Sequence, residues 1–447
     1  MALWVDIAGR NGWEKVQASL LYGQKELPIE ISPRHLLGVV EIQPMPLLAD
    51  PERTLAAALS HPIGTAALVD LAKGKESACI VVSDNTRPVP NKLLLPAILK
   101  TIGANVRRCT VLVASGLHHP LGQGAIQELL GGCLPDSCRV VCHDAQDDEQ
   151  LVKLGETRRG LPITLNRTYV ESDLKILTGL VEPHFMAGYS GGRKSICPGI
   201  AGRRTIQLLH SPLLLESPHA DSCILEGNPV HEEAMEIART ARPDFIVNVA
   251  IDGKKRISNI VAGDLEAAWS ACVAHVSQYA EVEIETEADI VITTNGGYPQ
   301  DRNYYQCGKG LVAASRVVKE GGAIILVSEC RDGLGSRSFR DNLVRLGEMK
   351  DLAAYLDYIS IESHFTLDQW GVEKLIQVLR RTSHLFVYSE GLKKEDAAHT
   401  CAEQISSVEE GIDRALSLLG DDAKILVMPQ GPYVIPTVRH VHGYGST

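Results

Sequence analysis

The chain has 447 residues, of which 45% are hydrophobic and 22% are charged, and its formal net charge is −11. A chain of this length exceeds one ordinary hydrophobic core and predicts two domains. The negative charge argues against nucleic acid and anionic membranes as partners, and no apolar run approaches the roughly 18 residues of a membrane helix. The 11 cysteines form no C-x-x-C pair, and the start of the chain does not resemble a signal peptide. Together these features predict reduced thiols and a cytoplasmic location.

The first clear strand signal is the apolar run 78–83, which precedes the helical pattern 92–102. The loop between them is short and polar, and it contains Asp84, Asn85, Thr86 and Arg87. One interpretation is a turn in which Asp84 caps the following helix. The other is that Arg87 binds a carboxylate or phosphate through both arms of its guanidinium group.

Two further strand signals follow in the same pattern. The run 109–114 is followed by Gly116 and His118, and the run 139–142 is followed by His143. Strands that alternate with helices predict a mainly parallel sheet whose site lies along the carboxyl ends of the strands. A single histidine after a strand is usually structural, but polar neighbours at adjacent strand ends favour a functional role for His118.

The segment 182–210 concentrates glycines, basic residues and histidines after the apolar run 174–180, which we expect to be a buried strand. Its centre predicts a loop whose backbone N–H groups cradle an anion, with nearby positive charge, and it contains Gly191, Gly192, Arg193 and Lys194. The segment also contains His184 and His210. A surface loop with scattered charges is the alternative interpretation.

A Walker A nucleotide-binding loop is disfavoured for this segment. Gly188 lies six residues before Lys194, and Ser195 follows the lysine, as that motif requires. Arg193, however, occupies the position of the second glycine of the motif, and Gly188 lies several residues beyond the predicted strand.

A second α/β domain is predicted to begin after the alternating acidic residues of 281–288. The apolar run 289–294 predicts its first strand, and the next helix opens with Tyr305, Gln306 and Lys309. Their spacing allows all three side chains to share one helix face, although a solvated polar face is the alternative.

We therefore expect an α/β protein of two domains, each with a mainly parallel sheet flanked by helices, and with the active site in the interdomain cleft. The predicted boundaries are residues 1–275 for the N-terminal domain and 276–423 for the C-terminal domain. The tail 424–447 is expected to return to the first domain.

Four motifs, taken in chain order, resemble the lactate racemase family. They are Asp-x-Thr-Arg-Pro at 84–88, Gly-x-His at 116–118, Pro-His-Phe-x-Ala-Gly-x-Ser-Gly-Gly-Arg-Lys-x-x-x-Pro-Gly at 183–199, and Tyr-Gln-x-x-Lys at 305–309. The family consists of 2-hydroxyacid racemases and epimerases that use a nickel-pincer nucleotide. The resemblance covers nearly the whole chain after its first twenty residues.

The resemblance implies a role for each motif residue. Lys194 would carry the cofactor, Ni(II)-pyridinium-3,5-bisthiocarboxylic acid mononucleotide, through a thioamide, and His210 would ligate its nickel. His118 and His184 would be the catalytic acid/base pair. Further cofactor contacts would come from Asp84, Asn85, Thr86, Arg87, Gly191, Gly192 and Arg193. The substrate would contact Arg87, Tyr305, Gln306 and Lys309.

The reaction that the resemblance implies is inversion at C2 of a 2-hydroxyacid by reversible hydride transfer. Loss of hydride leaves a planar 2-ketoacid that can accept hydride on either face. The implied partners are the small-molecule substrate and the proteins that make the cofactor. Two alternatives stay open, namely a non-catalytic carrier of the nickel cofactor and a zinc-dependent hydrolase that uses His184, His210 and a carboxylate.

Overall fold

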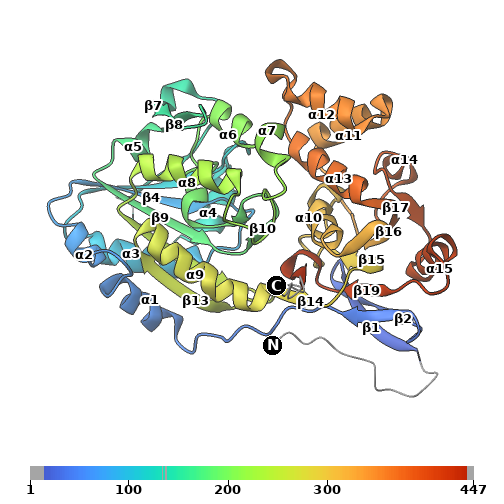
Figure 1. The fold of residues 1–447 in the computed structure, drawn as a ribbon. Helices are drawn as coiled ribbons and strands as arrows, with labels where there is room; N and C mark the ends of the chain where they lie inside the picture. The colour runs from blue at the N-terminus through green and yellow to red at the C-terminus, as the bar shows by residue number, and fades with distance from the viewer. Residues whose placement is uncertain (1–14, 133, 136–137, 440–447) are drawn as a thin grey trace, which may run out of the picture. The chain divides into compact units, whose positions relative to one another are not determined.

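The computed structural model of the protein describes residues 15–132, 134–135 and 138–439. The chain forms two compact units, and Figure 1 labels many of their helices and strands. The N-terminal unit comprises residues 44–278. The C-terminal unit comprises residue 279 onward together with the residues up to 43.

The N-terminal unit is built on a six-stranded sheet with the order β13–β12–β9–β4–β5–β6. All neighbouring strands are parallel except the edge pair β12 and β13. The strands are β4 Ser77–Ser83, β5 Arg108–Ala114, β6 Cys138–Cys142, β9 Leu174–Leu180, β12 Phe245–Ile251 and β13 Ile257–Gly263. The expected parallel sheet is thus present, with one antiparallel strand added at its edge.

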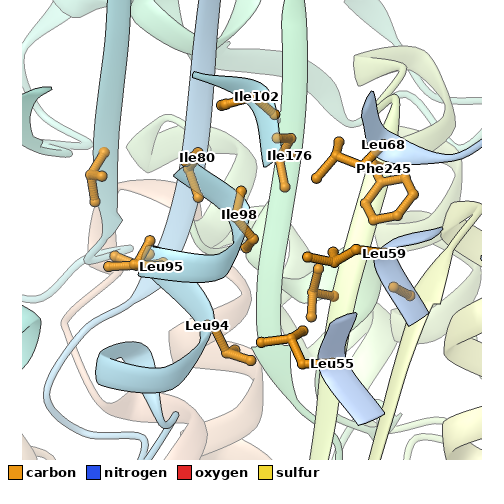
Figure 2. Close-up of a cluster of buried hydrophobic side chains, with 14 of the residues drawn as sticks. Leu55, Leu59, Leu68, Ile80, Leu94, Leu95, Ile98, Ile102, Ile176 and Phe245 are labelled. Atoms are coloured by element: carbon orange, nitrogen blue, oxygen red, sulfur yellow. The ribbon is translucent and has the colours of Figure 1, made fainter. Parts of the chain in front are cut away.

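One face of this sheet is covered by α1 Pro51–Ser60, α2 Leu68–Leu71 and α3 Asn91–Ile102. Figure 2 shows the resulting core, in which Ile98 of α3 lies among Ile80 of β4, Ile176 of β9 and Phe245 of β12. Successive strand residues point to opposite faces, and each large apolar side chain buried here contributes about 1.5–3 kcal/mol. Helix α4 Gln123–Leu130 follows β5.

The opposite face carries the segments that form the candidate site. Helix α5 (Arg167–Val170) contacts β4 and β5, and the short helix η2 (Gly192–Ser195) packs on β9 and against α8 (Pro229–Ala241). Other elements of the unit are η1 Asp148–Gln150, β7 Leu151–Glu156, β8 Pro162–Asn166, β10 Pro183–His184, β11 Gly188–Tyr189, α6 Arg203–Leu209, α7 Pro212–Leu215 and α9 Leu265–Ala280.

The C-terminal unit contains a second six-stranded sheet, with the order β18–β17–β16–β15–β19–β3 and every pair parallel. Its strands are β3 Leu36–Val39, β15 Ala288–Thr294, β16 Val318–Val327, β17 Thr382–Tyr388, β18 Glu403–Ile405 and β19 Ile425–Met428. Buried aliphatic residues fill the sheet, as expected for parallel strands covered on both faces.

A hairpin of β1 Val16–Tyr22 and β2 Lys25–Ile31 covers one face of this sheet together with α15 Val408–Leu419. Helices α10 Tyr304–Ser315 and α13 Gln369–Arg381 pack against β15, β16 and β17 and against each other. The remaining elements are α11 Arg337–Met349, α12 Leu352–Ser360, η3 Glu362–His364, α14 Lys394–Ala397, η4 Gly431–Tyr433, and the paired strands β14 Glu281–Ile284 and β20 Ile435–Val438.

The division into units differs from the expected boundaries at both ends of the chain. The tail was expected to return to the first domain, but β19 lies between β15 and β3, and β20 pairs with β14. Residues 16–39 were expected in the first domain, but they supply the hairpin and an edge strand to the C-terminal unit. The reason is that parallel strands pair by burying apolar faces, which sequence proximity does not determine. The expected active-site cleft stays a prediction.

A search of the described helices finds none that is long and apolar enough to cross a membrane.

Candidate active site

Asp84 and His118 lie at the carboxyl ends of β4 and β5 and form a hydrogen-bonded pair. The Nδ1 atom of His118 is 2.7 Å from Oδ2 of Asp84. Burial alone raises the pKa of Asp84, but hydrogen bonds from His118 and from the Thr86 side chain and backbone outweigh it and lower that pKa. An ionised carboxylate therefore orients the imidazole ring, as in other pairs where a carboxylate supports an acid/base histidine.

The rest of the β4 loop is more exposed. Asn85 and Thr86 lie at the surface, and Thr86 donates to Asp84 Oδ1 through its backbone N–H (3.1 Å) and its hydroxyl group (2.5 Å). The Nε atom of Arg87 lies 3.5 Å from Oε1 of Glu182, which lies two residues beyond the end of β9. This contact joins the β4 and β9 loops at the same edge of the sheet.

The glycines of the 188–192 loop are required by packing against the protein interior. Gly191 and Gly192 have φ values of 72° and 49°. A Cβ atom at Gly191 would lie 2.8 Å from Asn248 Oδ1, and one at Gly192 would lie 2.7 Å from the Trp269 ring. The side of each glycine on which a Cβ atom would lie is thus occupied by protein. The predicted contacts of Gly191 and Gly192 with a cofactor stay predictions.

Arg193 points into the interior of the N-terminal unit. Its Nη2 atom donates to the carbonyl of Ala187 at 2.6 Å, and its guanidinium lies 4.0 Å from the centre of the Trp269 ring. The side chain is fully buried, and burial lowers its pKa to about 9. Arg193 therefore holds the loop that carries His184, and its predicted cofactor contact stays a prediction.

The amine of Lys194 has a strongly lowered pKa. Burial, and to a lesser extent the charges of Arg193 and Arg87, lower its pKa to about 7. A substantial fraction of the amine is therefore neutral near pH 7. A neutral amine is a nucleophile, so the residue fits a covalent attachment to a carboxyl-derived group.

His210 ends helix α6 and is 8% exposed. Its Nδ1 atom lies 2.9 Å from the carbonyl of Ile206, so Nδ1 carries the proton and the lone pair is on Nε2. Burial, followed by the charge of Lys194, lowers its pKa to about 4. A neutral ring whose second nitrogen donates to a carbonyl is the usual state of a metal-ligating histidine.

Lys194 and His210 offer one nucleophilic amine and one neutral imidazole. The described part of the chain contains no group of three or more His, Cys, Asp or Glu side chains that could hold a metal ion. A zinc hydrolase needs about three protein ligands, so the described residues do not support that alternative. Lys194 and His210 have the chemistry that the resemblance expects of them, an amine that can be acylated and a neutral imidazole.

His184 lies in the short strand β10, in the loop after β9. Its Nδ1 atom accepts hydrogen bonds from the backbone N–H groups of Met186 (3.3 Å) and Ala187 (3.2 Å). Its ring stacks on Phe185 with 5.4 Å between centroids. The ring is thus held by backbone donors, whereas His118 is held by a carboxylate.

In the C-terminal unit, Tyr305, Gln306 and Lys309 lie in the first turns of α10, whose N-terminus is capped by Asn303. The Nζ atom of Lys309 donates to Oε1 of Gln300 at 3.1 Å. The hydroxyl group of Tyr305 accepts from Trp370 Nε1 at 2.9 Å, and its ring contacts that of Phe339 edge-on. The three residues thus lie in the same helix, and the prediction that their side chains share one face stays a prediction.

Several residues that contact the predicted site residues or the loops that carry them, each within its own unit, were not themselves predicted as site residues: Glu182, Asn228, Trp269, Gln300 and Trp370. Asn228 precedes Pro229, a pattern that predicts a helix cap. Its second contact, with Met186, is distant in sequence and carries no local signal. A cavity of about 490 Å³ beside α8 contains none of the predicted site residues and is lined by Arg158, Arg159, His231, Glu232, Met235, Glu236 and Arg239.

Comparison with known families gives matches along most of the chain. The sequence model described as "Lactate racemase N-terminal domain" matches residues 22–222, and the one described as "Lactate racemase C-terminal domain" matches residues 283–436. A lactate racemase of Lactiplantibacillus plantarum is 36% identical over 388 residues, which are 86% of this chain and 90% of that protein. A lactate racemase of Thermoanaerobacterium thermosaccharolyticum is 34% identical over 93% of this chain and 97% of its own.

Solved structures agree with these relationships. The lactate racemase apoprotein from T. thermosaccharolyticum superposes with a TM-score of 0.87 at 34% identity, covering 95% of this chain and 100% of that one. A protein from Thermotoga maritima superposes with a TM-score of 0.67 at 17% identity, covering 89% and 100%, which shows a shared fold.

Proposed function

The chain belongs to the lactate racemase family and is an isomerase acting on 2-hydroxyacids, and we propose that it inverts C2 by hydride transfer with a nickel-pincer nucleotide. The observation that carries the proposal is the pair formed by Lys194 and His210. A lysine with a pKa of about 7 lies close enough to lower the pKa of a histidine whose neutral ring is protonated at Nδ1. This combination suits one covalent anchor and one metal ligand.

The bound cofactor would supply a carbon that accepts hydride from C2 and returns it to either face of the 2-ketoacid. The residues of the chain would do the remaining work. His118 would accept the hydroxyl proton at Nε2, and the Asp84 carboxylate would stabilise the imidazolium ion that forms. His184 would exchange a proton with the hydroxyl oxygen when C2 has the opposite configuration.

Substrate binding would rest on charged and polar groups. Arg87, Gln306 and Lys309 would hold the carboxylate while the other substituents of C2 exchange places, with Tyr305 beside them. Anchoring the carboxylate keeps C2 in reach of the hydride acceptor in both configurations. A non-catalytic carrier would have no use for the Asp84–His118 pair, which favours the enzyme over that alternative.

The deciding experiment is intact-protein mass spectrometry with metal analysis after co-expression with the cofactor-making proteins. We expect an added mass of pincer-nucleotide size and about one nickel per chain. Zinc without a nucleotide, or an unmodified mass under conditions that load a known relative, would contradict the proposal.

Two variants then test the acid/base pair. His118→Ala and His184→Ala should each abolish inversion of a 2-hydroxyacid while they retain nickel, because neither residue ligates it. His210→Ala should instead lose nickel. Wild-type turnover in His184→Ala would rule out the two-histidine mechanism.

A further inference from the structure

We propose that His118 and His184 are held in opposite neutral tautomers, and that Asn228 is the positioning residue that fixes the tautomer of His184. The inference rests on the proposed function in taking these two rings as the acid/base pair. The hydrogen bonds that carry it involve the protein alone.

The tautomer of His118 follows from its carboxylate partner. An ionised carboxylate only accepts hydrogen bonds, so the nitrogen that faces Asp84 Oδ2 at 2.7 Å must carry a proton. In the neutral ring that proton is on Nδ1. The Nε2 atom therefore presents a lone pair, which is the state of a proton acceptor.

The tautomer of His184 follows from partners of the opposite kind. The backbone N–H groups of Met186 and Ala187 can only donate, and both point at Nδ1. Nδ1 must therefore be unprotonated, and the neutral ring carries its proton on Nε2. The reversed ring would place a carbon atom against two N–H donors, which disfavours that orientation.

Asn228 fixes the peptide unit that determines this choice. The carbonyl of Met186 and the N–H of Ala187 belong to one peptide unit, and Asn228 Nδ2 donates to that carbonyl at 3.0 Å. If the peptide unit between Met186 and Ala187 were rotated by half a turn, its carbonyl oxygen would face Nδ1 of His184. That nitrogen would then have to carry a proton to form a hydrogen bond. The bond from Asn228 opposes that rotation.

The orientation of Asn228 is itself fully determined. Its Nδ2 atom also donates to the carbonyl of Ile224 at 2.9 Å, and its Oδ1 atom accepts from the N–H groups of Val230 and His231. Only one placement of the amide satisfies two carbonyls and two N–H groups. The residue is completely buried, so water does not compete for these bonds.

A second support holds the next peptide unit. Arg193 Nη2 donates to the carbonyl of Ala187, and the Trp269 indole N–H donates to the carbonyl of Ser190 at 2.8 Å. The 184–190 loop is therefore held by hydrogen bonds from η2, from α9 and from the N-cap of α8. One Nε2 acceptor and one Nε2–H donor are thus prepared before any substrate binds.

The test is nitrogen NMR of the cofactor-free protein with selectively ¹⁵N-labelled histidine, at a pH where the rings are neutral. A protonated and an unprotonated ring nitrogen give well-separated resonances, and His118→Gln and His184→Gln assign the two rings. We expect protonated Nδ1 in His118 and protonated Nε2 in His184. Protonated Nδ1 in His184 would overturn the assignment.

Asn228→Asp tests the positioning role, because aspartate keeps the oxygen that caps α8 but loses the donor to Met186. We expect His184 to change from one tautomer to a mixture, while His118 keeps its tautomer as an internal control. Asn228→Ser, which retains a capping oxygen, should behave similarly. Asn303→Asp, a matched change at the cap of α10, should leave both rings unchanged.

An unchanged His184 spectrum in folded Asn228→Asp or Asn228→Ser would overturn the role of Asn228. Should neither variant fold, the wild-type spectrum still decides the tautomers. Because these spectra need no cofactor, their outcome is separate from that of the mass and metal analysis that tests the function.

Discussion

In the N-terminal unit the predicted anchor and metal ligand, Lys194 and His210, have pKa values set by burial, whereas in the C-terminal unit Tyr305, Gln306 and Lys309 lie half-buried in the first turns of one helix. Lys194 and His210 have pKa values lowered mainly by burial, and Arg193 has no exposed surface. Tyr305 and Lys309 are partly exposed, and their partners are the side chains of Trp370 and Gln300.

This difference corresponds to two kinds of task. Burial sets the charge state of a residue, which a covalent anchor and a metal ligand need. A helix face with exposed polar groups instead suits a ligand that arrives and leaves. We therefore expect changes at Lys194, His210 and Asp84 to affect cofactor loading or chemistry, and changes at Lys309 in the C-terminal unit to affect substrate affinity.

The largest expected effect is the loss of the covalent adduct in Lys194→Arg. The variant keeps a positive charge but has no amine nucleophile, so intact mass should show no adduct after co-expression with the cofactor-making proteins. Lys309→Arg is the matched control in the other unit and should keep a full adduct. An adduct on Lys194→Arg would place the anchor elsewhere.

The same lysine gives a pH dependence in the cofactor-free protein. Its lowered pKa means that the amine is protonated and unreactive well below pH 7 and becomes neutral and reactive as the pH rises through about 7. Labelling by an amine-reactive reagent, followed by peptide mass analysis, should show this midpoint at Lys194. Ordinary lysines, with pKa values of about 10.4, should gain reactivity only at much higher pH.

Asp84→Asn should lower kcat by roughly 10²–10⁴-fold, because the amide no longer fixes the His118 ring or stabilises its protonated form. Nickel content and adduct mass should stay at wild-type levels. A loss of adduct in this variant would instead assign Asp84 to the cofactor. Steady-state kinetics together with intact mass separates the two results.

Lys309→Ala should raise KM by roughly 10–100-fold with intact cofactor, since a hydrogen bond to a charged group contributes about 1.5–3 kcal/mol. Gln300→Ala should raise KM by only about 2–10-fold, because it removes a neutral group that orients the lysine. Equal effects of the two substitutions would mean that Gln300 itself contacts the substrate.

The smallest effects are on stability and have opposite signs in the two units. Gly192→Ala should lower the free energy of unfolding by about 1–3 kcal/mol, because φ is positive and the new Cβ meets Trp269. Gly308→Ala, within α10 and with no atom within 4 Å of its new Cβ, should raise it by about 0.5–1 kcal/mol. Urea unfolding measures both free energies. A change of the same sign in the two variants would contradict the expected difference between the two glycine positions.

Local sequence patterns located the strands that carry the site. The run 174–180 is strand β9 as predicted, and 78–83 and 109–114 match β4 and β5 to within one residue. An apolar run rich in β-branched residues and bounded by polar loops indicates a buried strand by itself. Such strands can therefore be predicted without knowledge of the tertiary structure. The hairpin β1–β2 and the edge strand β3 carry weaker patterns, and their membership of the C-terminal unit had no local signal.

The sequence by itself determined the family, the parallel α/β class and the identity of the candidate residues, because spacing within a motif is a property of the chain alone. Only the tertiary structure decided the state of those residues. Asp84 meets His118 across 34 positions, and Asn228 meets Met186 across 42. The pKa values of Lys194 and His210 depend on burial by segments distant in sequence. Charge state and tautomer arise from neighbours in space, which a linear pattern does not contain.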